Sequence, residues 1–320
     1  MKKLLALALA FSLMTACFPP AAAESRKISV IASIFPIFDW VREIVGEDEN
    51  VEVSLLLSSG TDLHSFHPSV QNLVEISSCD VFIHVGGPSD DWVRDALAGA
   101  VNPELRVVSL MEVLGDEVKD EEITEGMEHH EDHDHDHDSE ESEADEHVWL
   151  SLRNARRFVS VIAETLCEAA PAGAESFRAN AAAYIAKLDA LDARFAETVS
   201  LSPGKTVLFG DRFPFRYLTE DYGLTYYAAF SGCSAESEAS FATIVFLAGK
   251  VDELNLPAVL TTETPQFRIA ETIVENTRTR DQKIIGMNSM QGITADEIAA
   301  GATYLGIMEQ NLAVLQEALN

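Results

Sequence analysis

The sequence predicts an α/β protein with two similar lobes, each built on a mainly parallel sheet, joined by one long rigid helix. Apolar runs alternate with amphipathic segments in both halves, which is typical of parallel strands covered by helices. The order strand, loop, Phe-Pro, helix, Gly and strand occurs twice, at Phe35-Pro36 and at Phe213-Pro214. Between them, residues 174–199 contain no Gly or Pro and repeat apolar side chains at helical spacing. Two such lobes form an interlobe cleft where strand ends face each other, and ligands bind there.

The N-terminus has the pattern of an export signal. Two lysines after Met1 precede an apolar run over residues 4–16, which is too short to cross a bilayer of about 30 Å as a permanent helix. The lipobox-like run Met14-Thr15-Ala16-Cys17 predicts lipidation of Cys17, and hence an extracytoplasmic protein anchored to the cell membrane by lipid. The alternative is cleavage after Ala21-Ala22-Ala23, which would release a soluble periplasmic protein.

After a signal peptide and tether at 1–25, we expect an N-terminal α/β lobe over 26–173. Its expected strands, apolar along their whole length, are 28–34, 51–57 and 81–85, and its expected helices are 35–46, 69–76 and 152–169. Strands that are apolar on both faces indicate a parallel sheet covered by helices on each side.

The linking helix is expected over 174–200 and the C-terminal α/β lobe over 201–320. The expected strands of this lobe are 205–209, 224–230, 258–262 and 283–287, and its expected helices are 213–222, 239–255 and 268–277. Thr294 and Glu297 form a capping box, which predicts a last helix running to the C-terminus.

The negative charge is concentrated in one segment. The chain has a formal net charge of −31, and residues 116–146 contain seventeen acidic residues against one basic residue, Lys119. We therefore expect a disordered loop there, because like charges repel and few apolar side chains are available to bury. No basic patch suited to nucleic acid occurs along the chain.

The same loop is rich in histidine. Its five histidines, interleaved with Asp and Glu, are His129, His130, His133, His135 and His137. Imidazole and carboxylate both bind zinc and neighbouring metals, so the loop predicts accessory metal binding. The alternative is a solvated acidic loop or an artificial tag, but a tag would lie at a terminus. We expect deletion of residues 128–138 to lower the metal stoichiometry while leaving one tight site.

Two further histidines lie where a cleft ligand is expected. His64 follows the second strand in Gly-Thr-Asp-Leu-His-Ser-Phe, and His147 ends the acidic loop in Asp-Glu-His-Val-Trp. A single histidine in such a place is more often structural than ligating. Two of them at junctions between loops and regular elements, in a chain with a His-rich loop, favour a metal site.

These motifs resemble a known family. Gly-x-Asp-x-His-x-Phe, Asp-x-His-Val-Trp-Leu-Ser and the His/Asp-rich loop directly before the second motif are similar to the zinc- and manganese-binding proteins of ABC importers. The resemblance covers nearly the whole mature chain. It implies two lobes joined by a rigid helix, an ion in the interlobe cleft with His64 and His147 as ligands from the first lobe, and delivery to a membrane permease driven by a cytoplasmic ATPase.

The resemblance leaves the ligands from the second lobe open. Zinc-type members carry His after the first strand of that lobe and manganese-type members carry Glu, whereas this chain has Gly210. Asp211 is the expected substitute, and Glu263 is a further candidate after another strand. A common Asp near the C-terminus is replaced by Asn288. His67 is an alternative ligand three residues from His64.

Zn²⁺ is the expected cargo, because two imidazoles favour it over magnesium or calcium, and Mn²⁺ is the alternative. We expect affinity to fall below about pH 6, where the ligand histidines take up protons. Cys79, Cys167 and Cys233 lie far apart without a CxxC pair, so no cysteine-based zinc site is expected. No His-Glu-x-x-His motif supports an enzyme. The expected protein is a monomeric transport component, with a metal-containing surface adhesin as the alternative.

Overall fold

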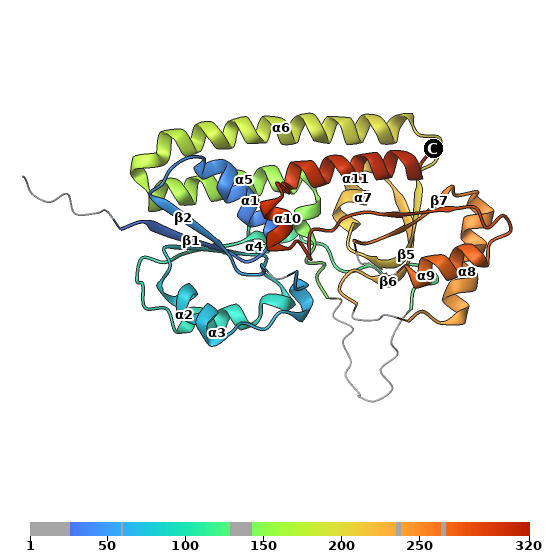
Figure 1. Ribbon diagram of the computed structural model, residues 1–320, viewed down its shortest axis with the longest axis horizontal. Helices are drawn as coiled ribbons and strands as arrows, with labels where there is room; N and C mark the ends of the chain where they lie inside the picture. Colours follow the sequence, from blue (N-terminus) through green and yellow to red (C-terminus); the bar gives the residue numbers. More distant parts are fainter. Residues whose placement is uncertain (1–25, 59, 129–142, 235–237, 264–266) are drawn as a thin grey trace, which may run out of the picture.

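The computed structural model describes residues 26–58, 60–128, 143–234, 238–263 and 267–320. It contains two four-stranded sheets in which every strand pair is parallel. The first has the order β2-β1-β3-β4, and the second has the order β6-β5-β7-β8. Each half thus repeats one topology, which confirms the prediction of two similar α/β lobes (Figure 1).

The N-terminal sheet is covered by helices on both faces. Its strands are β1 (Ile28–Ala32), β2 (Val51–Leu55), β3 (Val81–His84) and β4 (Arg106–Ser109). Its helices are α1 (Phe35–Val45), α2 (Val70–Ser78), α3 (Trp92–Ala98), α4 (Leu110–Leu114) and α5 (Leu152–Ala169). Val30 and Ile83 face the large core with α1 and α5, while Ile31 and Phe82 face α2 and α3. Of these elements, β4, α3 and α4 were not predicted from the sequence.

Helix α6 (Ala174–Leu201) runs along both lobes (Figure 1). Its 28 residues span about 42 Å at the ordinary rise of an α-helix. The buried side chains recur at helical spacing and are Phe177, Ala181, Tyr184, Leu188, Leu191, Phe195 and Val199. They pack against α1, α5 and α11, so the predicted long helix is present and contacts elements of both halves.

The C-terminal lobe contains β5 (Thr206–Phe213), β6 (Thr225–Ser231), β7 (Ala258–Thr261) and β8 (Lys283–Gly286). Its helices are α7 (Arg216–Tyr222), α8 (Phe241–Leu254), α9 (Arg268–Glu275), α10 (Ala295–Ala299) and α11 (Tyr304–Ala318). The predicted single C-terminal helix is divided into α10 and α11 at Gly301, whose φ of +96° is unfavourable for other residues. Within the described residues, no helix combines the length and apolar character that a bilayer crossing requires.

The first strand of this lobe is longer than predicted. A register shift between Phe209 and Arg212 lets β5 continue along β6 to Phe213. Asp211 therefore lies inside the strand, whereas the sequence predicted it just beyond the strand end. Pro214 follows the strand as well, so it does not open a helix as Pro36 opens α1.

Part of the acidic segment, which the sequence predicted to be disordered, has a defined structure. Residues 118–128 and 143–146, which we call the interlobe strap, are described and contact the C-terminal lobe. Asp120 and Ala144 form an antiparallel bridge, and the backbone N–H of Glu128 donates to Ala229 O at 2.9 Å. Met127 is buried in the main core. The five loop histidines, His129 to His137, lie outside the described residues, as does Cys17.

Candidate metal site

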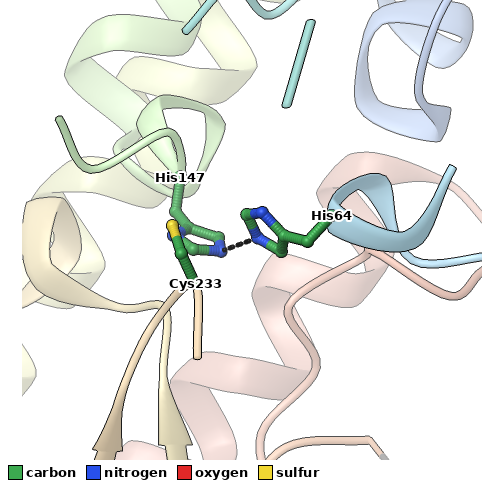
Figure 2. A group of neighbouring side chains, drawn as sticks. All are labelled: His64, His147 and Cys233. Atoms are coloured by element: carbon green, nitrogen blue, oxygen red, sulfur yellow. Dashed lines mark hydrogen bonds between the residues drawn. The ribbon is translucent and has the colours of Figure 1, made fainter. Parts of the chain in front are cut away.

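The imidazoles of His64 and His147 face each other. His64 lies in a single turn of 3₁₀ helix after β2, where Asp62 caps the turn by accepting the backbone N–H of His64 at 3.0 Å. His147 is fully buried and directly precedes a second such turn. Their Nε2 atoms are 3.2 Å apart. Figure 2 shows the two rings turned toward each other, with a dashed line between them. Two nitrogens bound tetrahedrally to zinc at 2.0–2.1 Å would be separated by about 3.3 Å.

The other nitrogen of each ring contacts a hydrogen-bond acceptor. His147 Nδ1 is 2.9 Å from Asp145 Oδ1. His64 Nδ1 is 2.8 Å from Ser89 Oγ and 3.2 Å from Glu146 Oε2. Ser89 donates its own hydroxyl proton to Glu146, so its oxygen is free to accept from His64. When both rings are neutral with their protons on Nδ1, the two Nε2 atoms present lone pairs to one point between them. Carboxylates that hold the other nitrogen of an imidazole in this way are typical of metal-binding histidines.

Cys233 reaches the same point from the C-terminal lobe. It follows β6, and the ligand atoms of His64, His147 and Cys233 all lie within 4.8 Å of one another (Figure 2). Its backbone N–H donates to Glu121 Oε1 of the interlobe strap at 2.8 Å. Burial, together with the neighbouring carboxylates, raises the pKa of the Cys233 thiol well above its usual range. The metal-free thiol is therefore protonated at neutral pH.

Gly232 fixes the approach of this segment to the ring. A Cβ at this position would lie 2.9 Å from His147 Cε1 and 2.9 Å from Phe213 O. Only a residue without a side chain allows the backbone beside Cys233 to pack this closely on the imidazole.

Gln291 is a further polar group beside the His147 imidazole. In the amide orientation that satisfies both ends, its NH₂ donates to Asp62 at 2.8 and 3.0 Å, and its Oε1 lies 2.7 Å from His147 Nε2. The side chain is 8% exposed. In this orientation Oε1 accepts a hydrogen bond from His147 Nε2, so the amide oxygen lies at the nitrogen that faces His64.

Asp62 links the two lobes beside His64 and Gln291. Besides His64 and Gln291, it accepts a hydrogen bond from Arg212 at 2.8 Å, in an ion pair between the lobes. Burial opposes ionisation of Asp62, but Arg212, His64 and the hydrogen bonds outweigh it and hold its pKa below the usual value. The carboxylate is thus charged at neutral pH and orients groups from both lobes.

Asp211 is engaged in the second sheet. Its Oδ2 accepts from the backbone N–H of Thr262 at 3.1 Å and from the Thr262 hydroxyl at 2.5 Å, and its Oδ1 accepts from the backbone N–H of Arg212 at 2.8 Å. Gly210 packs against α9, because a Cβ there would lie 2.7 Å from Ala270 Cα. The group of potential metal ligands among the described residues consists of His64, His147 and Cys233 and does not include Asp211.

Glu263 supports the loop that carries Gln291. It accepts from the Ser289 backbone N–H and hydroxyl at 2.8 and 2.7 Å, and from the Gln291 backbone N–H at 3.3 Å. Asn288 turns its Oδ1 to the backbone N–H of Met290. His67 is exposed and is not part of the ligand group found within the described ranges.

Two residues beside the histidines were not expected from the sequence. The cysteine spacing suggested no cysteine-based zinc site, whereas the structure brings Cys233 beside both histidines. All three described cysteines are free. Cys233 comes after Gly232 at the carboxyl end of a parallel strand, which was a usable signal. Gln291 had no comparable signal, since its position depends on the Asp62 contact.

Comparison with known proteins gives consistent matches over nearly the whole chain. Residues 30–318 match the family described as zinc-uptake complex component A, periplasmic. The zinc-binding lipoprotein AdcA of Streptococcus pneumoniae serotype 4 is 30% identical over 291 residues, which cover 91% of this chain and 56% of AdcA. The high-affinity zinc uptake system protein ZnuA of Bacillus subtilis is 28% identical over 322 residues, covering 99% and 97%. The chain spans about half the length of the AdcA relatives.

Solved structures share the architecture. The Zn(II)-bound ZnuA-like domain of Streptococcus pneumoniae AdcA has a TM-score of 0.71 at 26% identity, covering 92% of this chain and 99% of that one. The laminin-binding protein Lmb of Streptococcus agalactiae, described as bifunctional with adhesin and metal transporting activity, has a TM-score of 0.72 at 22% identity, covering 92% and 100%. The second likeness shows the fold alone. With the family match extending over residues 30–318, the chain belongs to the zinc-uptake complex component A family.

Proposed function

We propose that this protein captures Zn²⁺ outside the cytoplasm and delivers it to the permease of an ABC importer driven by a cytoplasmic ATPase. One observation carries the proposal: His64 Nε2 and His147 Nε2 are 3.2 Å apart while the other nitrogen of each ring contacts an acceptor. With the ring protons on Nδ1, the two Nε2 lone pairs converge on one point, at a separation that suits two ligands of one zinc ion. The family is one of transport binding proteins, and the chain is not an enzyme.

The cargo is zinc rather than manganese. Two imidazoles at tetrahedral spacing suit Zn²⁺, whereas Mn²⁺ prefers a larger number of oxygen ligands. The names of the AdcA and ZnuA relatives also support zinc. We propose that Asp211 and Glu263 keep structural roles, since both carboxylates already accept several hydrogen bonds.

The chain is proposed to act as a lipid-anchored monomer. Cys17 would carry the lipid, residues 1–25 would form signal and tether, and the lobes 26–173 and 201–320 would close on the ion from the two ends of the helix 174–200. The lipoprotein name of the AdcA relative supports the anchor, with a soluble periplasmic form as the alternative. No observation beyond a shared fold favours the adhesin role.

The loop histidines are proposed to collect zinc weakly near the tight site. The interlobe strap supports this accessory role because it fixes both ends of the loop. The backbone of Glu128 is hydrogen-bonded to Ala229, and the backbone of Glu143 is hydrogen-bonded to Glu121. Deletion of residues 129–138 leaves those bonds in place. It is expected to lower the zinc stoichiometry by calorimetry while one tight site remains, and loss of the tight site would contradict the accessory role.

The test of the main site is a zinc titration against a competing chromophoric chelator. His64→Ala and His147→Ala are each expected to lower the zinc affinity of the tight site by more than about 100-fold. Loss of a residue that only supports a ligand typically lowers metal affinity by roughly 10- to 100-fold. His67→Ala is the matched control, because His67 is exposed and outside the ligand group. Zinc binding by His64→Ala as tight as that of the control, in a protein folded by circular dichroism, would refute the site.

A further inference from the structure

We propose that Cys233 supplies a thiolate ligand from the C-terminal lobe, and that this sulfur makes the site select Zn²⁺ over Mn²⁺. The inference rests on the zinc capture proposed above. It identifies what faces His64 and His147 from the second lobe, where the expected histidine or glutamate position is Gly210.

The geometry requires little movement. A zinc ion with Zn–S near 2.3 Å and Zn–N near 2.0–2.1 Å separates sulfur from nitrogen by about 3.5 Å. The ligand atoms of Cys233, His64 and His147 already lie within 4.8 Å of one another. The contact of Gly232 with His147 holds the backbone of Cys233 beside the imidazole.

A second observation points to the same ion position. Gln291 Oε1 accepts a hydrogen bond from His147 Nε2 at 2.7 Å once its NH₂ is bound to Asp62, so this oxygen lies beside the nitrogen that would bind the ion. Together with Cys233, it completes a set of four donors: two imidazole nitrogens, one thiolate sulfur and one amide oxygen. Four donors of mixed N, O and S type are what tetrahedral zinc takes.

The carboxylates nearby bind the ligands rather than the ion. Asp145 contacts His147 Nδ1, Glu146 contacts Ser89 and His64, and Asp62 contacts Arg212 and the Gln291 amide. The direct set therefore contains no carboxylate. A thiolate is a soft ligand that favours zinc, while manganese binds best to carboxylate, carbonyl and water. On binding, the S–H bond breaks, an S–Zn bond forms, and the proton passes to solvent.

The other described cysteines do not compete for this role and provide controls. Cys79 is buried in the small core beside α2 and α3, where its thiol contacts Ile76 O. Cys167 is buried in α5, with its thiol 3.5 Å from Ala174 O. Cys167→Ser is the matched control because it changes a similar free thiol away from the ligand group formed by the described residues.

The experiment loads the full chain with one equivalent of Co²⁺, which takes the tightest site first, and records its absorption. Wild type and Cys167→Ser are expected to show a thiolate-to-cobalt charge-transfer band, and Cys233→Ser to lack it. Zinc affinity of Cys233→Ser is expected to fall at least 10- to 100-fold, with a smaller loss for manganese. The ratio of zinc to manganese affinity should therefore fall in the same variant.

The outcomes separate the two proposals. Tight loading of wild type without a charge-transfer band refutes the thiolate and leaves zinc capture standing. An unchanged zinc-to-manganese ratio in folded Cys233→Ser refutes the selectivity role. Absence of any tight zinc or cobalt site in wild type refutes the proposed function itself. The wild-type spectrum gives its answer even if Cys233→Ser fails to fold.

Discussion

The contact between Gly232 and the His147 ring allows the preorganisation of the site to be measured. In Gly232→Ala the new Cβ would lie 2.9 Å from both His147 Cε1 and Phe213 O, whereas ordinary contacts are 3.4–4 Å. Phe213 O belongs to the backbone of β5, so the segment of residue 232 must shift away from it, and the imidazole must in turn give way by about 0.5 Å. That displacement exceeds the roughly 0.2 Å tolerance of metal–ligand distances.

The expected effect is on binding more than on folding. Overpacking of this kind costs about 1–3 kcal/mol. The metal-free ring can move aside, but the zinc-bound ring cannot, so most of the cost is expected as a 10- to 100-fold loss of zinc affinity, or about 1.4–2.7 kcal/mol. Chelator competition measures it. Gly249→Ala in α8 is the control, since a Cβ there meets nothing within 4 Å. Equal affinities of the two folded variants would refute the reasoning.

Three other outcomes are expected. Because burial raises the pKa of the Cys233 thiol, zinc binding at neutral pH should release about one proton per ion in weakly buffered solution, and none from Cys233→Ser. Burial raises the pKa of Asp39 to about 6 from 3.8, so the native state is stabilised below pH 4 and loses that stabilisation as pH rises through 6. The unfolding free energy of wild type relative to Asp39→Asn should therefore fall by up to about 3 kcal/mol in denaturant titrations from pH 4 to 8. Zinc at about 100 times its Kd should add about 2.7 kcal/mol of stability, seen as a rise in Tm that chelator reverses.

Much of the fold follows from local sequence patterns. Apolar runs located most strands, and the uninterrupted helical spacing of 174–199 located α6 closely. The errors have physical causes. β4 is only four residues long, with Arg106 and Val107 toward solvent, so it lacks an apolar run. The extension of β5 depends on a register shift against β6, which is a tertiary effect.

The site was only half predictable for a related reason. His64 and His147 lie in recognisable motifs at the ends of regular elements, and both are at the site. Cys233 and Gln291 come from separate parts of the second lobe, 58 positions apart in the sequence. Their meeting depends on the close approach of Gly232 to an imidazole and on the Asp62 carboxylate, and neither contact has a local pattern.

The distribution of charge around the site explains how an acidic protein can discriminate against manganese, magnesium and calcium, the ions that carboxylate sites usually bind. Asp62, Asp145 and Glu146 contribute an attractive field for any divalent cation, yet each directs its oxygens at a ligand side chain, a backbone N–H or Arg212. Carboxylates in direct contact would suit manganese, magnesium or calcium, whereas carboxylates one layer behind act through charge and through the orientation of the rings. With one thiolate bound, Zn²⁺ would retain a single positive charge facing this acidic layer. The acidic layer then supplies attraction for the ion, and the imidazole, thiolate and amide donors supply the discrimination between metals.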